Sequence, residues 1–276
     1  MRLVLAALGV LVLAGGSATD IAVHARSLQP GEVAVLAVTG VDAATPVRVR
    51  AFGHVVSAYR DGDRWKALIG IDLDTKPGVY HAVVEPGGAS VELKVLPKTF
   101  RTRRLSVNEA FVTPPASAEA RIVREAEMMA EAWRHSSPER LWASGFVRPV
   151  PHEANSAFGT RSIFNGKPRN PHGGADFLSP AGTPVAAPAG GRVVIAQDLY
   201  YSGNTVIIDH GLGVFSMLAH LSRIDVHAGT SIEAGERVGL VGATGRVTGP
   251  HLHWAVRVND ARVDPLSLLQ VLASFH

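Results

Sequence analysis

The sequence contains no cysteine, and this absence excludes a disulfide framework, a thiolate zinc finger and a cysteine nucleophile. A strong excess of one charge is also lacking, because 27 Lys and Arg residues against 24 Asp and Glu residues leave a net charge of only +3. So small an excess is not typical of a nucleic-acid-binding protein, and we expect no nucleic-acid partner. Metal or acid–base chemistry must therefore come from carboxylates and from the 12 histidines.

Long hydrophobic runs are lacking except at the N-terminus, where residues 3–14 are all apolar. This run follows Arg2, precedes the small residues Gly16-Ser17-Ala18, and is shorter than the ~20 residues that span a bilayer. The pattern predicts a signal peptide over residues 1–18, export to the periplasm or cell envelope, and a mature chain that begins near Thr19. We expect no integral membrane span once the signal is removed.

The rest of the chain has a globular composition, since 46% of its residues are hydrophobic, and a disordered chain is excluded. At ~150 residues per domain, 276 residues suggest about two domains. Over residues 19–110, short apolar or alternating segments separated by Gly/Pro turns predict an N-terminal β-sandwich. Its expected strands cover residues 33–38, 47–50, 65–71, 79–84 and 91–95.

Residues 111–150 are predicted to form a helical linker. Ser117 follows the break at Thr113-Pro114-Pro115 and is the expected N-cap of the helix. A packed face is predicted from apolar residues at helical spacing: Ile122, Ala126, Met129 and Trp133.

Residues 151–276 return to a Gly-rich β pattern and are predicted to form a second domain. Its strands are expected over residues 183–196, 204–209, 214–218, 237–241 and 251–258, with a closing helix over 265–276. The predicted fold class is therefore mainly β, with an N-terminal β-sandwich, a helical linker and a C-terminal antiparallel β domain.

Two short motifs in this second domain bring metal-ligating residue types together. His172 and Asp176 are four residues apart around Gly173-Gly174, and His251 and His253 flank Leu252. In a strand, residues i and i+2 share a face and lie ~6.6 Å apart, so His251 and His253 point into one site. A flat strand would separate His172 from Asp176 by ~13 Å, which is too far for one metal ion. The two glycines must therefore bend the chain if both residues are ligands.

Two histidines and one carboxylate around zinc, with a fourth position open to water, are typical of hydrolytic zinc sites. Zinc lowers the pKa of its bound water to about 7 and polarises a carbonyl group. The spacing leaves open whether His251, His253 or both bind the metal. We interpret His210 as a turn residue that packs or hydrogen-bonds locally and His227 as an exposed turn residue.

Several segments resemble the lysostaphin-type (LytM-like) zinc peptidase domain. They are Asn165-Gly166, residues 171–177, residues 181–185, residues 219–222, residues 239–242, Thr244-Gly245, residues 249–253 and residues 263–266. The resemblance covers roughly residues 155–268, with the motifs in the family's order. It implies a mostly antiparallel β fold of the duplicated hybrid motif type, with the metal in a groove.

The resemblance also implies a role for each matched residue. His172, Asp176 and His253 would bind Zn²⁺, His251 would be catalytic, and His220 would be its partner, with the division between acid and base left open. The family hydrolyses peptides of bacterial peptidoglycan, and in exported Gram-negative-type members the usual target is the D-Ala to meso-diaminopimelate cross-link. The family often has Tyr at the position of Leu218 and Glu at that of Ala255, and these departures affect substrate specificity.

The sequence therefore predicts an exported zinc metalloendopeptidase that hydrolyses peptidoglycan peptide cross-links through a zinc-activated water. A non-catalytic activator of wall hydrolases is disfavoured because such relatives lose metal ligands. A lipoyl- or biotinyl-type carrier needs a lysine on an exposed turn, but Lys167 is the only lysine after Lys98 and precedes the β region. A pure β-sandwich binding module would leave both histidine motifs unexplained.

Overall fold

The computed structural model describes residues 19–273, apart from residues 43, 107, 108, 110, 111, 144, 156 and 157. The signal peptide expected over residues 1–18 lies outside the described residues, as do residues 274–276 of the closing helix expected over 265–276. Strands predominate in the described residues, together with two helices, α1 (Ala116–Arg134) and α2 (Pro265–Ala273). The predicted mainly β class is confirmed.

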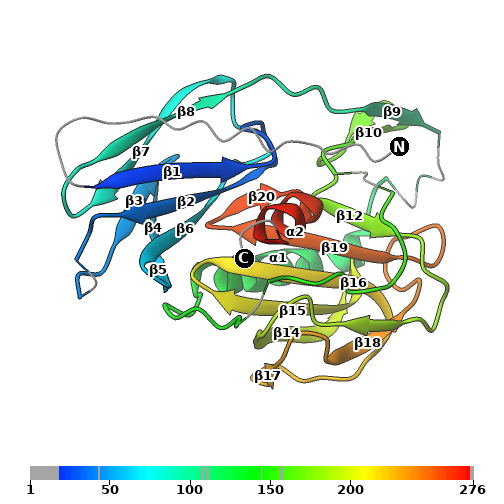
Figure 1. The fold of residues 1–276 in the computed structure, drawn as a ribbon. Helices are drawn as coiled ribbons and strands as arrows, with labels where there is room; N and C mark the ends of the chain where they lie inside the picture. Colours follow the sequence, from blue (N-terminus) through cyan, green and yellow to red (C-terminus); the bar gives the residue numbers. More distant parts are fainter. Residues whose placement is uncertain are drawn as a thin grey trace, which may run out of the picture.

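The N-terminal part is a sandwich of two four-stranded antiparallel sheets (Figure 1). One sheet has the order β1 (Asp20–Ala25), β2 (Val33–Thr39), β6 (Arg64–Gly70) and β5 (Tyr59–Asp61). The other has the order β4 (His54–Ser57), β3 (Arg48–Ala51), β7 (Gly78–Glu85) and β8 (Ser90–Val95). Buried and exposed residues alternate along β8, as expected for a strand with one face toward the core. Leu36, Val49, Ile69, Val84 and Leu93 lie in the core of the sandwich.

The C-terminal part is a nine-stranded antiparallel sheet. Its main path has the order β12 (Gly174–Phe177), β19 (Leu252–Val258), β16 (Val214–Ile224), β15 (Gly203–Gly211), β14 (Gly191–Leu199) and β17 (Ser231–Ile232). β13 (Pro184–Ala186), β18 (Arg237–Val241) and β20 (Ala261–Val263) pair off this path. The single strand expected over 183–196 is wrong, since the chain turns through residues 187–190 between β13 and β14. Pro188 has no N–H to donate within a continuous strand.

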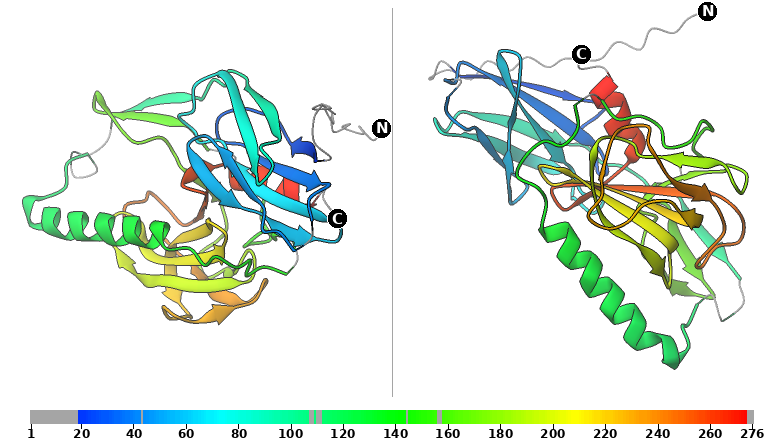
Figure 2. Two further views of the ribbon diagram at one scale, coloured as in Figure 1. Left: turned by 90° about the vertical axis from the view of Figure 1, so that its left-hand side faces the viewer. Right: turned by 90° about the horizontal axis from the view of Figure 1, so that it is seen from below.

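Helix α1 packs against the sheet through Met128, Met129, Ala132 and Trp133 (Figure 2). The Trp133 ring meets Phe215 edge-on, with centroids 5.2 Å apart. The expected Ser117 cap is wrong, because the helix begins at Ala116 and no side chain caps it. Ala126 is exposed, so the packed face is rotated slightly from the predicted one.

A small three-stranded sheet lies beside the segment that leads to His172. β9 (Thr102–Leu105) pairs in parallel with β10 (Arg161–Phe164), which pairs with β11 (Lys167–Pro168). Phe100 precedes β9 and Phe158 precedes β10, and their rings meet edge-on, with centroids 6.2 Å apart. Strand β9, which follows the sandwich in the chain, thus supports the segment that precedes His172, the first expected metal ligand. The sequence did not predict this pairing.

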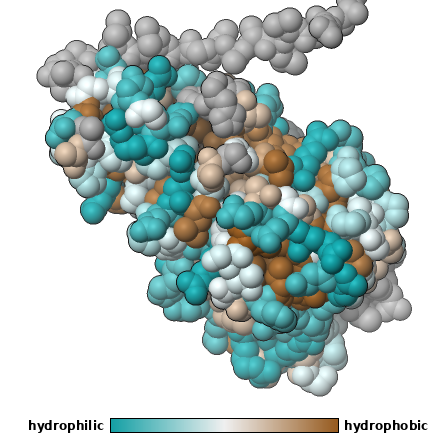
Figure 3. Space-filling view, turned by 60° about the horizontal axis from the view of Figure 1, so that its bottom comes forward, coloured by the Kyte–Doolittle hydropathy of each residue, from teal (hydrophilic) through white to brown (hydrophobic). Residues whose placement is uncertain are grey.

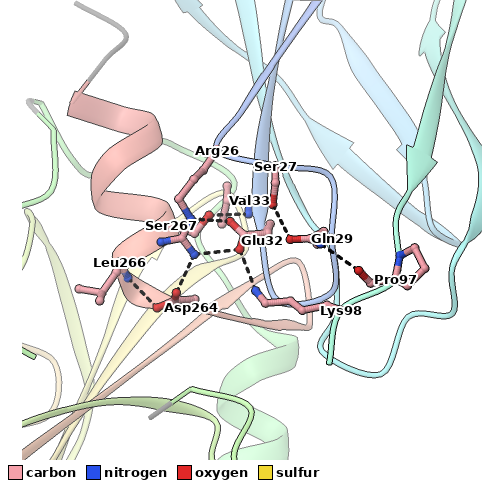
Figure 4. A network of polar contacts seen from close by, with 10 residues as sticks. All are labelled: Arg26, Ser27, Gln29, Glu32, Val33, Pro97, Lys98, Asp264, Leu266 and Ser267. Carbon is pink, nitrogen blue, oxygen red and sulfur yellow. Dashed lines mark hydrogen bonds and ion pairs between the residues drawn. The ribbon is translucent and has the colours of Figure 1, made fainter. Parts of the chain in front are cut away.

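The sandwich and the nine-stranded sheet are joined through α2, which lies between them (Figure 1). Val33, Val35 and Leu68 share one hydrophobic cluster with residues of α2 and the larger sheet. A polar network also crosses this boundary (Figure 4): Arg26 donates to Glu32 at 2.8 Å and to Asp264 at 2.7 Å. Lys98 also pairs with Glu32, and the Val33 N–H donates to Ser267 Oγ at 3.0 Å.

Hydrophilic residues cover much of the face drawn in Figure 3, where hydrophobic residues show as separate patches. Among the described residues, neither helix is long and apolar enough to cross a membrane.

Candidate metal centre

The register between β12 and β19 places two of the expected ligands side by side. Asp176 is the direct cross-strand partner of His253, with Asp176 Oδ1 2.9 Å from His253 Nδ1. Their neighbours Ala175 and Trp254 form the next cross-strand pair and are fully buried on the opposite face. Strand alternation therefore sends the apolar side chains into the core and the polar ones into the site.

The third expected ligand, His172, approaches from outside the strand. Its Nε2 lies 3.0 Å from Asp176 Oδ1 and 3.1 Å from His253 Nδ1. The predicted bend is confirmed, because β12 begins only at Gly174 and the backbone of His172 instead pairs with residues 159 and 160. A Cβ on Gly174 would lie 2.4 Å from Trp254 O and 2.9 Å from His253 Nε2, so only glycine fits.

The three side chains fit a metal ion better than they fit one another. Each imidazole nitrogen carries at most one proton and the carboxylate carries none, so hydrogen bonds cannot satisfy all three edges of the triangle. Zinc bonds of about 2.0–2.1 Å in tetrahedral geometry would place the ligand atoms about 3.3 Å apart, close to the 2.9–3.1 Å observed. Burial alone would raise the pKa of Asp176, but hydrogen bonds with His172 and His253 lower it far below its usual range. The carboxylate is thus kept ionised, as a metal ligand requires.

His251 and His220 stand beside this cluster with their tautomers fixed by backbone carbonyls. His251 Nδ1 lies 2.9 Å from Gly249 O, and His220 Nδ1 lies 3.0 Å from Thr244 O. A carbonyl only accepts hydrogen bonds, so each Nδ1 carries a proton, and in the neutral form of each ring the lone pair lies on Nε2. His251 Nε2 lies 3.8 Å from Asp176 Oδ1, and the His220 and His251 rings are 4.9 Å apart between centroids.

The backbone at His220 has an unusual conformation. Its φ is +65°, in the left-handed region that non-glycine residues rarely adopt. The His220 N–H donates to Ser202 O at 2.8 Å, which holds this kink in β16. Burial, helped by the neighbouring His253, lowers the pKa of the His220 imidazole to about 4. The structure thus keeps His220 neutral near pH 7, as a proton acceptor must be.

Residues 242–250 wrap around both of these histidines. Gly242 pairs with His251, and Thr244 and Gly249 supply the two carbonyls just described. The turn at residues 200–204 packs tightly on this segment, since a Cβ on Gly203 would lie 2.3 Å from the Thr244 backbone. The histidine pattern could not reveal the roles of Thr244 and Gly249, because their functional atoms are backbone oxygens.

The two departures from the family pattern lie on opposite faces of the sheet. Leu218 is fully buried in the hydrophobic core, opposite Trp254. Ala255 shares the partly exposed face of β19 with His253. Of the two, only the Ala255 position borders the metal centre.

His210 lies at the end of β15 and is completely buried. Its Nδ1–H donates to Gly190 O at 2.8 Å, so its Nε2 accepts from the Ser216 hydroxyl at 2.9 Å, and Ser216 Oγ accepts from the Trp254 indole N–H at 3.1 Å. This hydrogen-bond network ends at Trp254, which follows His253 on β19. The prediction that His210 hydrogen-bonds locally is confirmed in part, but its place is in a strand. His227 is exposed, as predicted.

Fold and site together define a mainly β protein with a His-Asp-His centre of the kind that holds a hydrolytic metal. Residues 170–265 match the model of peptidase family M23. A crystal structure of a putative peptidase M23 from Pseudomonas aeruginosa is 36% identical, with a TM-score of 0.69, over 89% of this chain and 96% of that one. The chain belongs to peptidase family M23.

Two curated relatives match over little more than a third of this chain. The peptidoglycan DD-endopeptidase ShyA of Vibrio cholerae is 43% identical over 104 residues, which are 38% of this chain and 24% of ShyA. The DD-carboxypeptidase/endopeptidase Mpg of Neisseria meningitidis is 43% identical over 97 residues, 35% of this chain and 22% of Mpg. The matched segment thus spans about a quarter of these relatives' own length.

Proposed function

We propose that this protein is a zinc-dependent endopeptidase that hydrolyses peptide cross-links of peptidoglycan in the cell envelope, after export directed by residues 1–18. The observation that carries the proposal is the convergence of His172, Asp176 and His253 within 3.1 Å, with His220 and His251 alongside, in a member of a peptidase family. The names of ShyA and Mpg support the choice of substrate, and the segment that matches the family model, residues 170–265, includes all five residues.

In this proposal His172 Nε2, Asp176 Oδ1 and His253 Nδ1 hold the zinc ion. Bound zinc supplies Lewis acidity, lowering the pKa of a water molecule and polarising the scissile carbonyl. The protein's own contribution is proton transfer and charge stabilisation. In the neutral rings of His251 and His220 the proton lies on Nδ1, and both rings stand beside the metal ligands, so the Nε2 of either can take a proton from the nucleophile and return it to the leaving amine. Once protonated, either also stabilises developing negative charge on the carbonyl oxygen.

The competing function suggested by the sequence is that of a non-catalytic relative, which only activates other wall hydrolases. This chain keeps all five side chains, and each adopts a geometry suited to its role. Gly174 also leaves the space that His253 needs. These features support catalysis, because a scaffold needs neither ionised ligands nor fixed tautomers.

The test is digestion of purified peptidoglycan by the purified protein, with and without a chelator, followed by mass spectrometry of the products and metal analysis of the protein. We expect cleaved cross-links from the wild type, loss of cleavage with the chelator, and recovery with zinc. His172→Ala should lose both metal and activity, His251→Ala activity alone, and His227→Ala, an exposed control, neither. The proposal is wrong if the wild type releases no peptides, or if the chelator and both site variants leave release unchanged.

A further inference from the structure

The backbone of residues 159 and 160 holds His172 from outside the larger sheet. The Gly159 N–H donates to His172 O at 2.7 Å, and the His172 N–H donates to Thr160 O at 3.0 Å. The Nδ1 of His172 is buried and, within the described residues, has no hydrogen-bond partner. A metal-bound imidazole is normally oriented by a hydrogen bond from its other ring nitrogen. The backbone pairing with residues 159 and 160 therefore carries much of the placing of His172.

Among the three proposed ligands, His172 alone is not placed by the register of β12 and β19. Asp176 and His253 are direct cross-strand partners, so the ladder fixes their separation. His172 precedes β12, which begins at Gly174. Zinc accepts its protein ligands within a narrow range of bond lengths, about 2.0–2.1 Å for histidine nitrogen. A shift of the backbone that pairs with His172 would therefore weaken zinc binding.

The ring of Phe158 ties this backbone to the N-terminal sandwich. Phe158 is only 8% exposed, and a Cβ on Gly31 would lie 2.3 Å from Phe158 Cε1, so the ring rests directly on Gly31. Gly31 lies in the turn between β1 and β2. Its N–H donates to Ile71 O at 2.8 Å, and its carbonyl accepts from the Asp264 N–H at 2.7 Å. Phe158 thus rests on a turn that hydrogen bonds hold from two sides.

Phe100, in the segment between β8 and β9, packs on the same backbone. Its ring meets the ring of Phe158 edge-on, with centroids 6.2 Å apart, and a Cβ on Gly159 would lie 2.1 Å from Phe100 Cδ1. Lys98 Nζ lies 5.4 Å from the centroid of the Phe100 ring and pairs with Glu32 at 2.8 Å (Figure 4). Glu32 belongs to the same turn between β1 and β2. Both aromatic rings are therefore anchored at one turn of the sandwich.

We propose that Phe158 is a positioning residue for His172, and that the sandwich turn at Gly31 acts through Phe158 to determine how tightly the centre binds zinc. The inference rests on the proposed function, because it concerns one of the three proposed zinc ligands. Phe158 acts through the backbone of residues 159 and 160 and takes no part in proton transfer. The N-terminal sandwich thereby becomes part of the metal-binding unit.

The test measures the zinc affinity of the full chain by competition with a chromophoric chelator. Gly31→Ala would force a methyl group against the Phe158 ring, and we expect zinc affinity to fall by about 10-fold, the lower end of the range for groups that orient a ligand. Gly53→Ala, in the turn between β3 and β4, is the matched control. The φ angles are +84° at Gly31 and +82° at Gly53, so both substitutions carry the same backbone strain. Nothing lies within 4 Å of the Gly53 Cβ position, and its variant should keep the wild-type affinity.

Removal of the ring gives a second measurement. Phe158→Ala should lower zinc affinity by about 10- to 100-fold, and Phe158→Leu, which retains more of the buried volume, should lower it less. Thermal unfolding of the metal-free proteins shows which variants are folded, and Gly31→Ala and Phe158→Leu decide the matter if Phe158→Ala does not fold. A merely structural role would lower the unfolding midpoint and leave the zinc affinity of the folded protein unchanged. The absorption spectrum of the cobalt-loaded protein reports ligand geometry, and it should change in Gly31→Ala but not in Gly53→Ala.

Three outcomes separate this inference from the proposed function. Wild-type zinc affinity in Gly31→Ala and in a folded Phe158 variant, or an equal loss in Gly31→Ala and Gly53→Ala, would overturn the inference alone. Absence of zinc binding by the wild type would overturn both. Zinc binding without hydrolysis of peptidoglycan would refute the proposed function, while the affinities of the variants would still decide the role of Phe158.

Discussion

Asp176 and His253 face each other across antiparallel strands β12 and β19, with Asp176 Oδ1 2.9 Å from His253 Nδ1. The pairing is set by the same register that buries Ala175 against Trp254 on the other face. A slip of one residue would turn His253 toward the core and Trp254 toward the site. The hydrophobic core thus enforces the geometry of the centre.

The space beside His253 gives a first prediction. Gly174→Ala would place a methyl group 2.8 Å from His253 Cε1 and 2.4 Å from Trp254 O, so the imidazole must move. We expect zinc affinity to fall by about 10- to 100-fold, comparable to the loss of a group that orients a ligand. Competition with a chromophoric zinc chelator measures this. Gly173→Ala is the control, because nothing lies within 4 Å of its Cβ position; equal affinities for the two variants would contradict the prediction.

The fixed tautomers give a second prediction. His220→Gln and His251→Gln each remove an imidazole that can accept a proton beside the site but leave the three ligands in place. We expect kcat to fall by about 10²- to 10⁴-fold, the usual contribution of a general acid or base, with one zinc ion still bound per chain. Steady-state kinetics with metal analysis separates these effects. Loss of zinc in either variant would instead make that histidine a ligand, and His227→Gln should match the wild type.

His210 gives a prediction about stability and pH. Burial lowers the pKa of its imidazole to about 4, whereas the unfolded chain takes up a proton below about 6.5. The contribution of the neutral His210 to the free energy of unfolding is therefore complete above about pH 6.5 and is lost as the pH falls toward 4. We expect this to remove about 2–3 kcal/mol from the free energy of unfolding between pH 7 and 4.5.

Denaturant unfolding at the two pH values measures that loss. His210→Gln keeps a donor for Gly190 O and an acceptor for Ser216 Oγ without a titrating group. It should lose less stability than the wild type over the same interval. An equal loss in both proteins would show that His210 does not carry the pH dependence.

The network around Arg26 gives a fourth prediction. Arg26→Met leaves the buried Asp264 without this cation and Glu32 paired with Lys98 alone. We expect a loss of about 3–5 kcal/mol in the free energy of unfolding, typical of breaking a buried ion pair from one side. The sandwich and larger sheet should still unfold together, since they share a core.

Differential scanning calorimetry tests both parts of this prediction. Arg50→Met is the matched control, because it breaks an exposed pair with Glu85 that contributes at most about 1 kcal/mol. Equal destabilisation by the two substitutions, or two separate transitions in the wild type, would contradict the prediction.

Local patterns were sufficient for much of the fold. Alternation predicted the strands around Val49, Val84 and Leu93, and Pro265 does begin the closing helix. The i, i+2 spacing placed His251 and His253 on one face, and the glycines between His172 and Asp176 correctly predicted a bend. Local signals failed where the chain had alternatives, as at Ser117, because Pro115 precedes the helix and the cap is not a side chain.

Residue type and short spacings along the chain suffice to predict the mainly β class, the kinds of side chain available for chemistry and the segments that carry them. Which atoms meet depends on three-dimensional packing. Three contacts illustrate this: His220 with Thr244, Arg246 with Tyr201 and Arg26 with Asp264. The first joins residues 24 positions apart in the sequence and the last joins residues 238 positions apart. Strand register and packing set such contacts, and neither is written in the spacing of the residues along the chain.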